Sequence, residues 1–258
     1  MSFGRTLADA EHAEHAKQEV RERLWALLDR GKAALPPGAE GRIPNFVGSD
    51  EAANRLAALP VWRDAKVVKS NPDKAQLPVR ARALVDGKLL YVAVPRLAHQ
   101  RPFIQLDPTS LQVSPWEAAS SKHAAAAGRN VSVGEVRPVD LVICGSVVVN
   151  RQGVRLGKGA GYSDLEVALL LEAGLISPRT VLVTTVHPLQ VVDAPLPETA
   201  HDFRVDLVVT PRETIWCPPH QRPTGVMWEH LTEEKIAAMP VLAATRPLGP
   251  LAPKGDGT

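Results

Sequence analysis

Residues 155–164, which read RLGKGAGYSD, combine the residue types that bind anions. The glycines are Gly157, Gly159 and Gly161, and the cations are Arg155 and Lys158. Glycines let backbone amides approach an anion closely, while the cations and the N-terminus of a following helix add positive potential. The spacing matches neither the P-loop nor the dinucleotide-binding pattern, and a flexible hairpin loop is the alternative interpretation. We predict a phosphate site.

Two carboxylates are candidates for the same site. Asp164 closes the glycine stretch at the start of a predicted helix, and Asp202 stands just before a strand-like run. Asp164 also suits a helix N-cap without any ligand. Because the ends of strands in an open α/β sheet gather around one crevice, the two carboxylates would meet beside the phosphates. This arrangement predicts Mg²⁺, which takes one or two protein carboxylates plus phosphate oxygens and water.

The elements that must position these residues follow an α/β pattern. The apolar, strand-like runs are 65–70, 88–94, 139–149, 180–186 and 203–210. The helical candidates between them are roughly 75–85, 115–127 and 164–174. Near-continuous apolar strands alternating with helices predict a mainly parallel sheet covered on both faces, which is a three-layer α/β/α fold.

The chain divides into three predicted parts. Residues 1–48 hold an amphipathic helix that ends near Gly31, followed by a loop rich in proline and glycine, and we expect this part to pack on the body. Residues 49–245 form the α/β domain, which opens with a short helix capped by Ser49. Residues 246–258 carry proline and glycine without a pattern and predict a disordered tail.

Composition limits the partners. Thirty Lys and Arg against 28 Asp and Glu leave a formal charge of +2, which gives no reason to expect nucleic acid or a membrane. There is no secretory signal and no run of about 18 apolar residues. Cys144 and Cys217 are far apart and form neither a disulfide framework nor a CxxC pair, so we expect a cytoplasmic protein. The oligomeric state is left open.

Three separated motifs resemble those of the 5-formyltetrahydrofolate cyclo-ligases, also called methenyltetrahydrofolate synthetases, over residues 15–212. The family's R-L-G-x-G-x-G-Y-Y-D stands here as Arg155, Leu156, Gly157, Gly159, Gly161, Tyr162 and Asp164. Its H/N-D-x-x-x-D appears as His201, Asp202 and Asp206. Its K-x-x-L-R helix appears as Lys17, Val20 and Arg21.

The resemblance implies a fold like that of the NagB/RpiA/CoA-transferase group and an ATP- and Mg²⁺-dependent ligase of one-carbon metabolism. It would convert 5-formyltetrahydrofolate to 5,10-methenyltetrahydrofolate with release of ADP and phosphate. The implied ATP-binding residues are Lys17, Arg21, Arg155, Gly157, Lys158, Gly159, Ala160 and Gly161, with Arg155 and Lys158 catalytic. Asp164 and Asp202 would bind Mg²⁺, and Tyr162, Ser163 and Asp73 would bind the reduced folate.

The departures from the family pattern fall mostly on the folate side. Ser163 replaces the second tyrosine, Ala160 replaces a frequent lysine, and Asp73 stands where the family's substrate loop presents a glutamate. The combination resembles a divergent branch that includes the methenyltetrahydrofolate synthetase domain-containing proteins. Two alternatives follow: an ATP-dependent enzyme acting on a non-folate small molecule of cofactor metabolism, and a non-catalytic nucleotide- or RNA-binding module.

Overall fold

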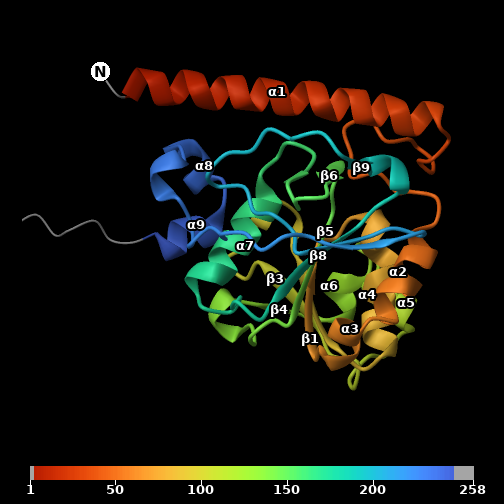
Figure 1. The fold of residues 1–258 in the computed structure, drawn as a ribbon. Helices are drawn as coiled ribbons and strands as arrows, with labels where there is room; N and C mark the ends of the chain where they lie inside the picture. The colour runs from red at the N-terminus through yellow and green to blue at the C-terminus, as the bar shows by residue number, and fades with distance from the viewer. Residues whose placement is uncertain (1–2, 247–258) are drawn as a thin grey trace, which may run out of the picture.

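A large, mainly parallel sheet forms the centre of the computed structural model, which describes residues 3–246 (Figure 1). Its strand order is β11-β10-β8-β5-β1-β2-β3-β4. The parallel strands are β1 (Val67–Ser70), β2 (Leu89–Ala93), β5 (Leu141–Cys144), β8 (Val181–Thr185) and β10 (Leu207–Val209). The antiparallel strands at the two edges are β3 (Phe103–Leu106), β4 (Arg129–Val131) and β11 (Thr214–Trp216). The prediction of a mainly parallel sheet is therefore confirmed.

The register of the central strands explains why both faces are buried. Val68 on β1 pairs with Leu90 on β2 and Leu141 on β5, and these side chains belong to one apolar cluster. Tyr91 and Val142, one position further along, belong to the cluster on the opposite face. Successive side chains of a strand point to opposite faces, so a continuous apolar run supplies two cores.

Helices cover the two faces in three layers, as predicted. One face packs against α2 (Ser49–Ala57), α3 (Pro60–Asp64), α4 (Leu77–Val85), α5 (Pro115–Ala119) and α6 (Ala124–Ala127). The other face packs against α7 (Tyr162–Glu172). Figure 1 shows the first group gathered on one side of the sheet and α7 on the other.

A second, small sheet lies on the α7 side and supports the first helix. It consists of β6 (Val148–Asn150) between β7 (Arg155–Leu156) and β9 (Val191–Val192). The amphipathic stripe of α1 (Phe3–Arg30), which includes Leu24 and Leu28, shares an apolar cluster with Val148 of β6. In Figure 1, α1 lies along the outside of the molecule above this sheet.

Short helices complete the described part of the chain. The 3₁₀ turns are η1 (Lys74–Gln76), η2 (Pro95–Leu97), η3 (Val133–Glu135), η4 (Pro188–Gln190) and η5 (Trp228–His230). Two final helices, α8 (Glu233–Ala237) and α9 (Pro240–Thr245), pack against α7 in a separate apolar cluster. Of the predicted tail, residues 247–258 lie outside the described residues.

Several predicted boundaries were wrong for local reasons. The run 139–149 is two strands, because the chain leaves the large sheet after Cys144 and enters the small one at Val148. The helix predicted over 115–127 is interrupted between α5 and α6. Gly48 rather than Ser49 is the N-cap of α2. The antiparallel strands β3 and β4 carry no strong apolar run and were missed.

Candidate functional site

The glycine-rich stretch is a loop between β7 and α7. Leu156 of β7 pairs with Val148 of β6, and α7 begins at Tyr162. Gly159 has a φ of 99° and Gly161, the N-cap of α7, has a φ of 69°. Residues that carry a side chain rarely adopt these φ angles, so both positions require glycine. The loop therefore places its amides at the N-terminus of a helix of 11 residues, where anions are favoured.

Arg155 is held rigidly beneath the loop. Only 3% of the residue is exposed, and its guanidinium lies 4.1 Å from the centre of the Phe203 ring. Its NH2 group donates to Asp164 Oδ1 at 3.1 Å, whereas its buried Nε has no partner among the described residues. Burying a hydrogen-bond donor without an acceptor costs free energy. An anionic ligand near Arg155 would compensate the charge of its guanidinium. Asp164 consequently binds Arg155 and does not cap α7.

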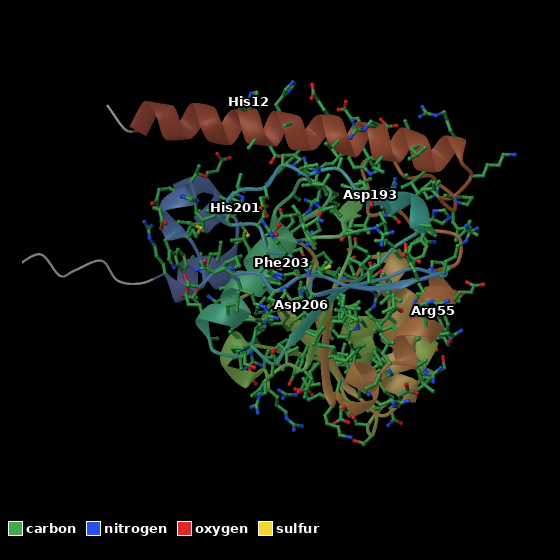
Figure 2. The ribbon with its side chains drawn as sticks, in the orientation of Figure 1. His12, Arg55, Asp193, His201, Phe203 and Asp206 are labelled. Carbon is green, nitrogen blue, oxygen red and sulfur yellow. The ribbon has the colours of Figure 1, made fainter. Side chains whose placement is uncertain are left out.

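The first helix contributes Lys17 to the same place. Lys17 Nζ donates to Asp202 Oδ2 at 2.5 Å and to Thr199 Oγ1 at 3.2 Å, and 3% of the lysine is exposed. The backbone amide of Thr199 also donates to Asp202 Oδ2, at 2.6 Å. Figure 2 labels His201 and Phe203, the residues on either side of Asp202, on the segment that runs beneath α1.

Arg21, one turn further along α1, fixes the loop directly. Its Nε donates to the carbonyl oxygen of Gly157 at 2.9 Å, and its NH1 donates to Glu14 Oε1 at 2.7 Å. A Cβ built on Gly159 would lie 3.3 Å from Arg21 NH1. A side chain at Gly159 would therefore press on the end of the Arg21 side chain.

These groups enclose a hollow of about 120 Å³, which we call the phosphate hollow. Its lining residues are Glu14, Lys17, Arg21, Arg155, Leu156, Gly157, Gly159, Ala160, Gly161, Asp164, His201, Asp202 and Lys235. All the residues predicted to bind ATP phosphates or Mg²⁺ line it, except Lys158. Lys158 is exposed on the other side of the loop.

The two carboxylates of the phosphate hollow are electrostatically coupled. Burial raises the pKa of the Asp164 carboxyl, and the charge of Asp202 raises it further against the opposing effect of Arg155. Burial acts on Asp202 in the same direction, but hydrogen bonds from Lys17 and Thr199 outweigh it and hold the pKa of Asp202 below its ordinary value. A cation between the two carboxylates would relieve the repulsion that Asp164 experiences.

The residues present fit Mg²⁺. Within residues 12–246, the hydrogen bonds of Asp164 use Oδ1 and those of Asp202 use Oδ2, so each carboxylate keeps a second oxygen. Over the same residues no cluster of three or more His, Cys, Asp and Glu side chains is arranged as a metal site. Two carboxylates completed by phosphate oxygens and water are the donor set that Mg²⁺ takes with nucleotides.

A second hollow of about 410 Å³ lies on the other side of the glycine loop, and we call it the acceptor hollow. It shares Gly157, Ala160, Gly161 and Asp164 with the phosphate hollow. Its other lining residues are Ile43, Asn71, Pro72, Asp73, Pro95, Arg96, Gly145, Lys158, Tyr162, Ser163 and Glu166. The three predicted substrate residues, Tyr162, Ser163 and Asp73, therefore lie together there. One loop separates the two hollows.

One wall residue of the acceptor hollow, Glu166, belongs to a buried ion pair. Lys69, on the central strand β1, is fully buried and pairs with Glu166 of α7. Asn71 Nδ2 donates to the same oxygen, Glu166 Oε2, at 2.8 Å, and Ser163 Oγ lies 3.4 Å from Asn71 Oδ1. The second oxygen of Glu166 is therefore left for the hollow. Burial raises the pKa of Glu166, which Lys69 opposes.

Sequence reasoning missed Lys235, Glu166, Lys69 and Asn71. Lys69 and Glu166 interrupt apolar runs, which is a usable signal because a charge inside a buried strand or helix needs a partner. Lys235 offered no such signal, since it lies on a separate short helix after the last motif. Ile43, in the loop before α2, also lines the acceptor hollow, whereas its neighbour Arg42 is exposed.

Fold and site together define an α/β protein with a hollow that is built on a glycine-rich loop and lined by cations and carboxylates. The chain belongs to the 5-formyltetrahydrofolate cyclo-ligase family, whose model matches residues 13–211. The match includes α1 from residue 13 onward, the glycine loop and Asp202, and it ends before α8.

Relatives of known name support the same membership. The chain is 37% identical over 246 residues to a methenyltetrahydrofolate synthase domain-containing protein of Mus musculus, covering 90% of this chain and 63% of that protein. It is 37% identical over 247 residues to the Homo sapiens protein of the same name, covering 90% of this chain and 61% of that protein. The chain thus spans less than two thirds of the length of these relatives.

A solved structure shares the fold. The 5,10-methenyltetrahydrofolate synthetase of Aquifex aeolicus superposes with a TM-score of 0.50 at 21% identity, covering 81% of this chain and 94% of that one.

None of the helices within residues 3–246 is both long enough and apolar enough to span a bilayer.

Proposed function

We propose that this chain is an ATP- and Mg²⁺-dependent ligase that closes the ring of 5-formyltetrahydrofolate to give 5,10-methenyltetrahydrofolate. The observation that carries the proposal is the pair of hollows on either side of one glycine loop. A triphosphate in the phosphate hollow would direct its terminal phosphate across the loop toward an acceptor. Family membership supplies the reaction class.

The proposed reaction needs positioning and charge neutralisation more than covalent catalysis. The formyl oxygen attacks the γ-phosphorus and ADP leaves, which gives an imidoyl phosphate. The neighbouring folate nitrogen then attacks the imidoyl carbon and loses its proton to solvent, and the C–O bond to phosphate breaks with release of inorganic phosphate. Both steps develop or shift negative charge on phosphate oxygens, which the hollow is built to bind.

Each predicted residue has a task in this scheme. Arg155, Lys17 and Arg21 bind phosphate oxygens, with their positions fixed by Asp164, Asp202 and Glu14. Lys158 is exposed and lines the acceptor hollow, so it is suited to the transferred phosphoryl group. Mg²⁺ held by Asp164 and Asp202 would supply charge neutralisation on the phosphates.

The direct test follows product formation. The full chain is mixed with Mg·ATP and 5-formyltetrahydrofolate, and the absorbance of methenyltetrahydrofolate is recorded beside a standard cyclo-ligase. We expect product with the wild type and a loss of at least about 100-fold with Asp164→Asn, because the carboxylate is needed at the metal. Absence of product where the standard enzyme works contradicts the proposed substrate.

A second candidate is the same chemistry on a non-folate formyl or carbonyl compound. It is favoured by the acceptor hollow, where Ser163 replaces an aromatic residue and Glu166, the partner of buried Lys69, lines the wall. A screen of small carbonyl compounds with detection of ADP distinguishes the two. ADP release that depends only on a folate excludes this candidate.

A further inference from the structure

A cation from outside the family-matched region reaches the phosphate hollow. Lys235 of α8 lines that hollow, although the family match ends at residue 211. Lys235 Nζ lies 3.4 Å from the position that a Cβ on Gly161 would occupy. Gly161 is the N-cap of α7, so the ammonium group stands beside the helix N-terminus on which the glycine loop ends.

Packing fixes α8 in this position. Ile236, the residue after Lys235, is buried with Met239 against Leu165 and Leu169 of α7. The Thr232 side chain accepts a hydrogen bond from the backbone amide of Lys235 at 3.2 Å and so caps the first turn of α8. Because the apolar side of α8 is anchored on α7, the neighbouring lysine is directed over the start of α7.

Among the described residues that line the phosphate hollow, Lys235 is a cation without a carboxylate partner. Its lining includes the cations Lys17, Arg21, Arg155 and Lys235 and the carboxylates Glu14, Asp164 and Asp202. The first three cations each pair with one of the carboxylates. Within residues 12–246, Lys235 Nζ makes no ion pair. The described lining therefore carries a surplus positive charge at the edge formed by α8, which suits an anion with more than one charge.

We propose that Lys235 binds the polyphosphate of the nucleotide, as a lysine supplied by the C-terminal helices to the α7 N-terminus. The inference rests on the proposed function, because it needs the phosphate hollow to bind ATP. An ammonium group donates charge-assisted hydrogen bonds to phosphate oxygens, and the amides at the start of α7 bind the same ligand from below. The C-terminal helices are thus part of the site.

The test compares the affinity of the full chain for ATP and for inorganic tripolyphosphate by calorimetry. Lys235→Met removes the charge and keeps the length of the side chain, and Lys235→Arg keeps the charge. Lys122→Met is the matched control, because Lys122 is exposed in the turn between α5 and α6, away from both hollows. Thermal unfolding of each variant checks that α8 and α9 remain packed.

We expect Lys235→Met to weaken both ligands about tenfold, as the loss of one charge-assisted hydrogen bond would. Lys235→Arg and Lys122→Met should bind like the wild type. If Lys17→Met weakens ATP binding and Lys235→Met does not, the role of Lys235 is wrong and the proposed function stands. If the wild type binds neither ATP nor tripolyphosphate, both proposals fail.

Discussion

Lys17 Nζ lies 2.5 Å from Asp202 Oδ2, which joins the first helix to the segment that precedes β10. Both groups have little exposure, with 4% of the Lys17 side chain and 13% of the Asp202 side chain accessible. The contact makes α1 a wall of the phosphate hollow rather than an appendage. A carboxylate so placed is held ionised, which is the form that binds a metal ion.

Lys17→Met should destabilise the protein and weaken ATP binding together. Removing one partner leaves Asp202 buried without its counter-ion, so we expect the free energy of unfolding to fall by about 2–3 kcal/mol, with Thr199 still bonded to Asp202. Urea denaturation measures this loss. Adding Asp202→Asn to Lys17→Met should recover part of it, and a double variant less stable than the sum of the singles contradicts the pairing.

The sheet and many of the residues that line the two hollows were predictable from the sequence, whereas some of their contacts were not. Apolar runs such as 180–186 predict buried parallel strands because both faces must be covered. The strand β3 was missed because Gln105 interrupts its short apolar run, and β4 was missed because Val131 is its one apolar residue. Asp164 was predicted as a metal ligand or an N-cap, and only the fold shows that Gly161 caps α7 instead.

Gly159→Ala should impair ATP binding in the phosphate hollow more than it lowers the stability of the fold. The backbone at Gly159 has a φ of 99°, and a Cβ there would press on the Arg21 guanidinium at 3.3 Å. We expect a loss of about 1–2 kcal/mol in stability and at least about tenfold in ATP affinity, because the loop must shift. Gly134→Ala is the matched control, since a Cβ at Gly134 would meet nothing within 4 Å. Equal effects of the two substitutions would contradict this account.

For the Lys69–Glu166 pair, we predict that the stability losses of the two single substitutions do not add up in the double variant. Either Lys69→Met or Glu166→Gln alone leaves one buried charge unpaired, and we expect each to cost about 3 kcal/mol of stability. The double variant removes both charges and keeps an acceptor for Asn71, so it should be close to the wild type in stability. Chemical denaturation of the four proteins measures the coupling. Additive losses would show that the pair does not act as a unit.

Replacing Asp73 should stabilise the protein by an amount that depends on pH. Burial raises the pKa of Asp73 despite the nearby charges of Lys158, Arg80 and Lys69. When the pKa of a carboxyl is higher in the folded state than in the unfolded state, the protein loses stability as the pH rises above the unfolded-state pKa, which is about 3.9. Asp73→Asn should therefore raise the unfolding midpoint at pH 7, and the gain should disappear below about pH 4. A gain that is the same at both pH values contradicts the assignment.

Sequence reasoning reached the phosphate side of the site more completely than the acceptor side. Arg155 and Asp202 lie in stretches whose residue types indicate their chemistry, Lys17 was indicated by the resemblance to the family, and the fold brings all three into one hollow. Glu166 interrupts an apolar run, but its partner Lys69 is identified only when the fold places β1 against α7. A contact between distant elements depends on packing direction, which no local spacing reveals.

The central claim is that the hollow beneath α1 binds a metal-bound triphosphate, and calorimetric titration of the full chain with ATP tests it most directly. The titration is made with Mg²⁺ and again with EDTA, for the wild type and for Asp164→Asn. We predict binding with Mg²⁺ that weakens at least about tenfold in EDTA, and a smaller Mg²⁺ dependence for Asp164→Asn. No ATP binding, or an affinity indifferent to both Mg²⁺ and Asp164→Asn, would contradict the claim.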